Sequence, residues 1–360
     1  MKLFYFTSKC YPSLAPDDIY ALHLADAMSK FFENFTFFVS KFDSEKPKYI
    51  KTDFGFARFR FFYSFFYIFY LLIFYKNIVF FSNDINLLKI FIFYKKFFQF
   101  KLVVDWHMLF TEKENLNILQ NADLNITTSK KLAEKLLKIG DKINRKVKVE
   151  TVYGGVKLNY FKDITISRED IKIPEDKKII SYVGGFKTLG KEKGLKTIID
   201  SLKFLPEEFL CLLVGGKKDE IEEYKNYVKK QNLQNRVFLI GRVLNEEIHN
   251  YMSLSDYLII PYPDEPHFRD FGFPMKVYEY MASGKPIIYS KLDLVEEIVA
   301  DCALGFVPEN PLDLAEKIIY LNKNEIIKKR MTQKSLEKVR FLDWKEKAKK
   351  IHDIILANLI

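Results

Sequence analysis

The sequence predicts an α/β protein built from two doubly wound parallel sheets in tandem. The first observation is two series of strand-length apolar runs without polar alternation, each followed by a helical pattern. Such strands are typical of parallel sheets that helices cover on both faces. The second observation is the length of 360 residues, which exceeds one ordinary core and suits two domains of about 150 to 180 residues each.

The first series occupies the N-terminal half of the chain. A helix is expected from Asp18 to about Phe31, and another follows the N-cap residue Ser129 and ends at Gly140. The expected strands are residues 2–8, 35–40, 77–82, 101–107, 122–129 and 147–153. We therefore expect an N-terminal domain at residues 1–163. The polar stretch 164–178 has the charge and turn content of an interdomain linker.

The second series predicts a C-terminal domain at residues 179–343. Its expected strands are residues 179–185, 209–216, 237–241, 257–262 and 286–290, and a last helical stretch covers residues 344–359. Ligands of such sheets bind beyond the carboxyl ends of the strands. We expect the functional site in the cleft between the two domains.

Composition narrows the classes of ligand. Lys and Arg number 57 and Asp and Glu 47, so the net charge is +10 at pH 7. The basic residues are scattered along helices, without a compact stripe of interleaved aromatics, which favours an anionic small substrate or membrane surface over nucleic acid. The three cysteines, Cys10, Cys211 and Cys302, are far apart. They predict buried thiols in a reducing compartment, with neither a disulfide framework nor a metal cluster.

The apolar run at residues 61–75 is the candidate for membrane contact. Its 15 residues fall short of the ~20 that span a bilayer. We expect a core helix, with an interfacial aromatic surface as the alternative. The residues that follow Lys2 are strand-length and do not resemble a secretory signal. These observations predict a cytoplasmic protein, with peripheral contact to the inner face of the membrane as an option.

Residues 271–290 join a loop, a short helix and a buried strand in a layout that suits a nucleotide sugar. Pro274 can open a helix, so the free backbone donors from Met275 onward and the positive helix end are available to a phosphate. Glu279 follows one turn later and can accept both hydroxyls of a ribose. One carboxylate alone fits an ordinary solvated helix better, so this interpretation depends on the rest of the chain.

A second loop, after the strand at 179–185, is crowded with Gly and Lys. Gly184 and Gly185 permit close backbone approach, and the lysines that follow supply charge to a diphosphate. Residues 185–191 also spell the phosphate-loop pattern of nucleoside triphosphatases. That pattern needs Ser or Thr next to hold magnesium, and the chain has Glu192 there, which makes the triphosphatase a remote alternative.

These residues resemble the donor-site signature of retaining glycosyltransferases with the GT-B fold, of the glycosyl transferases group 1 or family 4 type. In the helix segment the matches are Pro274, Lys276, Glu279, Tyr280, Met281, Ala282, Gly284, Lys285 and Pro286, and in the Gly/Lys loop they are Glu192, Lys193 and Gly194. Further matching blocks follow in the family's order over nearly the whole chain. Phe271 replaces the first Glu of the commoner signature, and Gly185 stands at the position of an Arg, with Lys187 as the nearest cation.

The resemblance implies two Rossmann-like domains, a terminal helix at 344–360 that packs back on the first domain, and a role for each matched residue. Lys193 and Lys187 would neutralise the diphosphate, Glu279 would hold the ribose, and His107 would contact the donor sugar. The implied catalytic residues are His107, Lys193 and Glu279, and the implied donor-binding residues are Gly184, Gly185, Lys187, Lys193, Arg242, Val243, Phe273, Pro274, Met275, Lys276 and Glu279. Near Arg242 and Val243, the backbone would read the nucleobase.

The sequence therefore predicts a glycosyltransferase that moves a sugar from a nucleotide diphosphate donor to a glycan or lipid-linked acceptor. By resemblance the reaction retains the anomeric configuration and needs neither metal nor a cofactor besides the donor. Ala15 and Pro16 replace a Gly-Gly pair of the family's acceptor loop. This departure, with the missing Glu and Arg, keeps a non-catalytic sugar-nucleotide-binding scaffold as the first alternative. A sugar-nucleotide epimerase of the same fold is the second.

Overall fold

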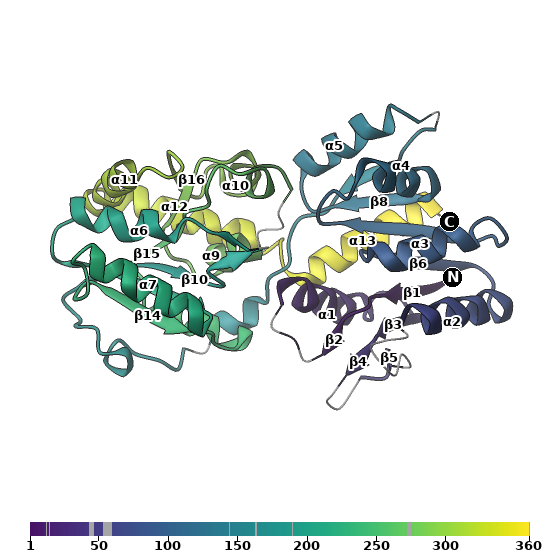
Figure 1. Cartoon of the computed structure of the whole chain (residues 1–360), viewed down its shortest axis with the longest axis horizontal. Helices are drawn as coiled ribbons and strands as arrows, with labels where there is room; N and C mark the ends of the chain where they lie inside the picture. The colour runs from purple at the N-terminus through teal and green to yellow at the C-terminus, as the bar shows by residue number, and fades with distance from the viewer. Residues whose placement is uncertain are drawn as a thin grey trace. The chain divides into compact units, whose positions relative to one another are not determined.

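The structure is a computed structural model of the whole chain, and it describes residues 1–11, 13, 15–42, 47–52, 60–143, 145–162, 164–188, 190–271 and 275–359. The chain divides into two compact units (Figure 1). The first contains Met1–Gly155 and Asp343–Ile360, and the second contains Val156–Leu342. Each unit has its own parallel sheet, which confirms the predicted fold class.

The sheet of the first unit, as far as the structure describes it, is seven-stranded with the order β5-β3-β1-β6-β7-β8-β9. All its strand pairs are parallel. The strands are β1 (Lys2–Phe6), β3 (Phe35–Val39), β5 (Ile50–Thr52), β6 (Ile78–Ser82), β7 (Lys101–Trp106), β8 (Leu124–Thr127) and β9 (Val149–Thr151). A separate short parallel pair consists of β2 (Cys10–Tyr11) and β4 (Lys41–Phe42). The strands β1, β3 and β6 in this sheet are largely apolar and buried, as expected where helices cover both faces, whereas the short strands β5 and β9 are more polar.

Helices cover this sheet in two groups. They are α1 (Pro16–Met28), α2 (Arg60–Phe74), α3 (Ile85–Tyr94), α4 (Glu112–Asn121), α5 (Lys130–Gly140) and α13 (Trp344–Leu359). From α2 to α5, each helix packs against the next, whereas α13 packs against α1 (Figure 1, yellow against purple). Because the strand order reverses beside β1 and crossovers are right-handed, α1 lies on the face opposite to α2–α5.

The second unit holds a parallel sheet that is six-stranded among the described residues, with the order β14-β13-β10-β15-β16-β17. Its strands are β10 (Lys178–Val183), β13 (Phe209–Gly216), β14 (Val237–Gly241), β15 (Tyr257–Ile260), β16 (Ile287–Ser290) and β17 (Leu304–Phe306). Its helices are α6 (Leu195–Ser201), α7 (Lys218–Lys230), α8 (Ile248–Ser253), α9 (Met275–Ala282), α10 (Asp293–Val299), α11 (Pro311–Lys323) and α12 (Glu325–Val339). A hairpin of β11 (Lys187–Thr188) and β12 (Lys191–Glu192) follows β10.

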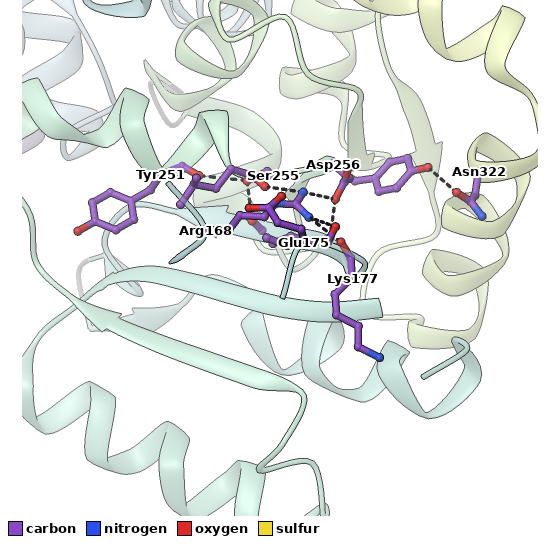
Figure 2. Close-up of polar contacts among 11 residues, drawn as sticks. Arg168, Glu175, Lys177, Tyr251, Ser255, Asp256 and Asn322 are labelled. Carbon is purple, nitrogen blue, oxygen red and sulfur yellow. Dashed lines mark hydrogen bonds and ion pairs between the residues drawn. The ribbon is translucent and has the colours of Figure 1, made fainter. Parts of the chain in front are cut away.

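The polar stretch 164–178, predicted as an interdomain linker, lies within the second unit, which begins at Val156. Arg168 donates to the carboxylate of Asp256 at 2.9 Å and to the carbonyl oxygens of Lys177 and Leu254 (Figure 2). Asp256 also accepts the Ile179 N–H at 2.7 Å, at the start of β10. The unit boundary lies at Gly155, because these charge-assisted hydrogen bonds fix the stretch to the sheet.

The apolar run 61–75 forms α2, and only one face of this helix belongs to the core. Ile68, Leu71 and Leu72 are buried, whereas Phe66 and Phe74 are 53% and 65% exposed. The prediction of a core helix is therefore right for one face and wrong for the other. Within the described ranges, every helix is too short or too polar to cross a bilayer.

Candidate functional site

Gly184, which follows the last residue of β10, makes room for a lysine from another element. Its φ of +144° lies in the region that favours glycine. A Cβ on Gly184 would overlap the Nζ atom of Lys276, which belongs to α9. At Gly185 a Cβ would fit without a clash, because the nearest atom that it would meet is the Lys187 carbonyl oxygen at the ordinary contact distance of 3.8 Å. Of the two glycines, Gly184 is therefore the one that the close approach of Lys276 requires.

Lys276 lies against aromatic rings and a strand end. Its Nζ donates to the carbonyl oxygen of Val183, and it lies 5.0 Å from the ring centre of Tyr182 and 5.6 Å from that of Tyr280. Burial lowers the pKa of Lys276 to about 8, while the charge of Glu279 acts in the opposite direction. The sequence matched Lys276 to a signature but did not reveal that it reaches back to β10.

Lys193 is the second cation at this strand end. Burial and, to a smaller extent, repulsion by Lys276 lower the pKa of Lys193 to about 7, against a weaker attraction by Glu220. The Lys193 N–H donates to the carbonyl oxygen of Phe186 at 3.1 Å, which ties the end of the hairpin to its start. Two neighbouring lysines with lowered pKa values mark a place where positive charge is not yet neutralised. Such groups are candidates for a functional site.

Glu279 lies on the same face of α9 as Lys276, three residues further along the helix. Burial raises the pKa of the Glu279 carboxyl, against the charge of Lys276 and a hydrogen bond with Asn245. Sequence reasoning missed Asn245. Its signal was a polar side chain just beyond β14, where parallel sheets carry their ligands. Arg242 and Val243 belong to the same segment, the first exposed and the second half-buried.

Part of the predicted donor site lies outside the described residues. Phe273 and Pro274 are among these positions, so the turn that opens α9 is not described. Met275 is the first residue of the helix. The side chain of Phe271, which replaces the family's first Glu, also lies outside the described set.

Unlike Lys193 and Lys276, Lys187 has its charge balanced by a neighbouring carboxylate. It forms an ion pair with Glu223 of α7 at 2.6 Å, and this hydrogen bond raises the pKa of Lys187. Glu192 accepts the first backbone donors of α6, from Leu195 at 2.6 Å and Lys196 at 3.4 Å. A phosphate at this helix would have to displace that carboxylate, which counts further against the remote alternative of a triphosphatase loop.

In the first unit, His107 follows β7 at its carboxyl end and is held by two neighbours. Its Nε2 lies 3.1 Å from Oδ2 of Asp105, and its ring meets the Tyr20 ring edge-on at 4.3 Å. The Tyr20 hydroxyl donates to the same Asp105 oxygen at 2.9 Å. A carboxylate bound to one ring nitrogen fixes the tautomer and direction of an imidazole.

The Asp105 carboxylate is almost fully buried and is balanced by a lysine of α13. Burial alone would raise the pKa of Asp105, but His107, Lys347 and Tyr20 outweigh it and lower this pKa. Burial lowers the pKa of Lys347 to about 8, with Asp105 acting against the shift. The Lys347 Nζ donates to the Val152 carbonyl oxygen at 2.7 Å. The sequence offered no signal for this lysine, because lysines are frequent along α13.

Comparisons with known proteins bear on the family and on the fold. Residues 163–338 match the family model of glycosyl transferases group 1. An uncharacterised glycosyltransferase of Methanocaldococcus jannaschii is 32% identical over 167 residues, which cover 46% of this chain and 44% of that protein. The chain spans about half the length of the curated relatives it matches.

Solved structures extend the likeness to both units. Sucrose-phosphate synthase of Thermosynechococcus elongatus matches with a TM-score of 0.77 at 19% identity, covering 99% of this chain and 98% of that one. The Anabaena protein HepE in complex with UDP matches with a TM-score of 0.78 at 14% identity, covering 99% and 100%. The chain therefore has the GT-B fold, and its residues 163–338 match the family of glycosyl transferases group 1.

Proposed function

We propose that the protein is a glycosyltransferase that moves a sugar from a nucleoside diphosphate to a glycan or lipid-linked acceptor. The observation that carries this proposal is the pair Lys193 and Lys276 beside Glu279, at the carboxyl end of β10. The family match supports it, as do the complexes of HepE with UDP and with UDP-glucose. The resemblance further supports retention of configuration and a reaction without metal or added cofactor.

In this proposal the two lysines act on the leaving group. When the bond between the sugar and the diphosphate breaks, the departing oxygen gains negative charge. Fixed ammonium groups at that position stabilise this charge more than they stabilise the bound donor. Glu279 accepts the ribose hydroxyls, and the Asn245 amide holds the carboxylate in place. His107, held by Asp105, would hydrogen-bond the transferred sugar. We further propose a cytoplasmic protein in peripheral contact with the membrane.

Donor binding tests this proposal directly. UDP, GDP, ADP and their sugar conjugates are compared by thermal unfolding with EDTA present. One nucleoside diphosphate at a hundred times its Kd is expected to raise the Tm by about 5 °C or more. Glu279→Ala is expected to weaken this stabilisation at least about tenfold in ligand concentration, because it removes the ribose acceptor.

Glu223→Ala provides the matched control for Glu279→Ala. This substitution also removes a carboxylate from the second unit, but one that pairs with Lys187. It is expected to leave donor binding intact or strengthen it. Absence of stabilisation by every nucleotide, or equal losses in the two variants, would contradict the proposed site. Binding without transfer or donor hydrolysis would favour the non-catalytic scaffold.

Asp105→Asn tests the role of the first unit. The imidazole of His107 loses the carboxylate that orients it, so kcat is expected to fall about tenfold or more while the thermal shift with the donor nucleotide is retained. The control is Tyr20→Phe, which removes the other hydrogen bond to Asp105 but keeps the ring that meets His107. Its kcat is expected to change less than threefold, roughly one lost neutral hydrogen bond or less. Equal kcat losses in both variants would indicate a structural role for Asp105.

A further inference from the structure

The outer surface of α2 and the end of α3 expose a set of large apolar side chains, called here the aromatic face. Its members are Phe62, Tyr63, Phe66, Phe69, Tyr70, Ile73, Phe74, Phe93 and Phe97. All are at least 40% exposed, and Phe97 reaches 69%. Single exposed apolar residues need no explanation, but a gathered set of this size marks an interaction surface.

Ring contacts show that the aromatic face is continuous. Phe62 lies 4.8 Å from Phe66 between ring centres, and Phe93 lies 5.5 Å from both Phe65 and Phe97. These contacts bridge from α2 to the end of α3. The face is therefore one surface across two helices.

The opposite side of α2 packs in the core of the first unit. Ile68, Leu71 and Leu72 point into the first unit and are buried. A helix that is apolar all round needs cover on every side, as in a large core or a lipid environment. In α2 the sheet side has that cover, and the aromatic face requires a partner.

A lysine-lined pocket adjoins the aromatic face. The pocket has a volume of about 980 Å³, and its lining residues include Lys76, Lys95 and Lys101 but no Asp or Glu. Lys95 is paired with Asp123 behind the lining, so Lys76 and Lys101 are the lysines that offer charge to a ligand. Phe98 also lines it, and its ring meets Phe69 of the aromatic face at 5.8 Å. The pocket and the face are thus neighbouring parts of one surface.

The charges around the aromatic face indicate an anionic partner. Neither α2 nor α3 contains an acidic residue. Lys76 and Lys96 are exposed just after α2 and α3, and Lys101 is exposed at the start of β7. Aromatic rings flanked by lysines suit the interface of a bilayer with anionic lipids, where rings enter the headgroup region and ammonium groups meet phosphates.

We propose that the aromatic face and the lysine-lined pocket dock the protein on an anionic lipid bilayer, with a lipid phosphate in the pocket. A second copy of the chain fits less well, because a symmetric pair would bring two lysine rims together. The inference rests on the proposed function in one respect, since such docking would bring the enzyme to a lipid-linked acceptor. Its test is independent of sugar transfer.

Vesicle flotation tests the docking surface. The full chain is mixed with vesicles of phosphatidylcholine alone or with phosphatidylglycerol added. Binding is expected only with the anionic lipid, and it is expected to weaken as salt rises. The double variant Phe66→Glu, Phe74→Glu is expected to lose about tenfold or more in vesicle affinity, because it places charge in the headgroup layer.

Two exposed apolar residues of the second unit provide the matched control. Ile326→Glu, Phe341→Glu changes the net charge equally at residues that are 85% and 76% exposed. This control is expected to bind like the wild type. For the pocket, Lys76→Gln, Lys101→Gln is compared with Lys229→Gln, Lys230→Gln on α7. Only the first pair is expected to reduce binding to anionic vesicles.

Several outcomes would overturn the inference. They are no flotation of the wild type, equal losses in variant and control, or a wild-type dimer that does not float and that Phe66→Glu, Phe74→Glu makes monomeric. The donor thermal shift is measured on each protein. Vesicle binding without a donor shift would reject the proposed function and keep the docking surface. A donor shift without vesicle binding would reject the docking surface and keep the proposed function.

Discussion

Lys193→Met is expected to remove nearly all transfer activity and yet raise the stability of the ligand-free protein at pH 7. The pKa of Lys193 is lowered from 10.5 to about 7 by burial and by Lys276. An unfolded chain keeps this lysine charged at pH 7, so folding carries a cost there. This destabilisation is complete below about pH 7, where Lys193 is charged in both the folded and the unfolded protein. It disappears as the pH rises toward 10.5, where the lysine is neutral in both. Methionine removes it, with an expected rise in Tm of about 2–4 °C for each kcal/mol recovered.

The same substitution removes a cation from the departing diphosphate. The expected loss in kcat/KM is about 100-fold or more, as when other preorganised charge-stabilising groups are deleted. In the wild type, binding of a diphosphate favours the charged form of Lys193. Affinity is therefore expected to be greatest below about pH 7 and to fall as the pH rises, by at most about tenfold per unit for this group.

Calorimetric titration of the donor nucleotide between pH 6 and 9 measures this coupling. Buffers of different ionisation enthalpy reveal proton uptake on binding, which Lys193→Met is expected to diminish near pH 7. Lys196→Met is the control, because Lys196 is a half-exposed lysine whose Nζ lies 5.4 Å from the ring centre of Tyr227. If Lys193→Met kept its affinity, or lost ligand-free stability at pH 7, the assignment of this lysine would be wrong.

Gly194→Ala is expected to produce the largest loss of stability among single substitutions in the loop between β10 and α6. Gly194 has a φ of +82°, and a Cβ there would overlap the carbonyl oxygen of Pro261 and lie 2.8 Å from its carbon. A backbone carbonyl next to β15 cannot turn away as a side chain could. The free energy of unfolding is expected to fall by about 4 kcal/mol or more, because the backbone conformation and the clash both disfavour alanine.

Gly190→Ala isolates the contribution of the backbone conformation. Gly190 has a φ of +77°, close to that of Gly194, but a Cβ there would meet nothing within 4 Å. Gly190→Ala is expected to lower the free energy of unfolding by only about 1 kcal/mol. Urea unfolding measures both variants under the same conditions. Equal midpoints would show that the clash is relieved, and donor binding would then be expected to survive in Gly194→Ala as well.

The sequence predicted most strands because fully buried parallel strands are continuous apolar runs. It did not predict β5 or β17, each of which is three residues long and too short for such a pattern. For α2, an all-apolar helix gives no indication of which face remains exposed. The pattern therefore could not show that one side of the helix would lie on the surface.

Proximity of candidate site residues was predictable where a local motif carried them. Lys276 and Glu279 stand three residues apart on one helix, so a sequence motif places them on one face. Contacts between distant segments were not predictable in this way. Glu223 pairs with Lys187 and Lys347 balances Asp105, and in each case the partner comes from an element with no local sign of that role.

The placement of α13 sets an order of assembly during translation. Residues Val156–Leu342 form a continuous unit that can fold as soon as they leave the ribosome. The unit that begins at Met1 also requires Asp343–Ile360, because α13 packs on α1 and brings Lys347 to Asp105. The part of the chain that is synthesised first is thus completed last. Until α13 emerges, the carboxylate that holds His107 lacks its buried counter-charge, so the nascent chain cannot yet assemble the histidine site.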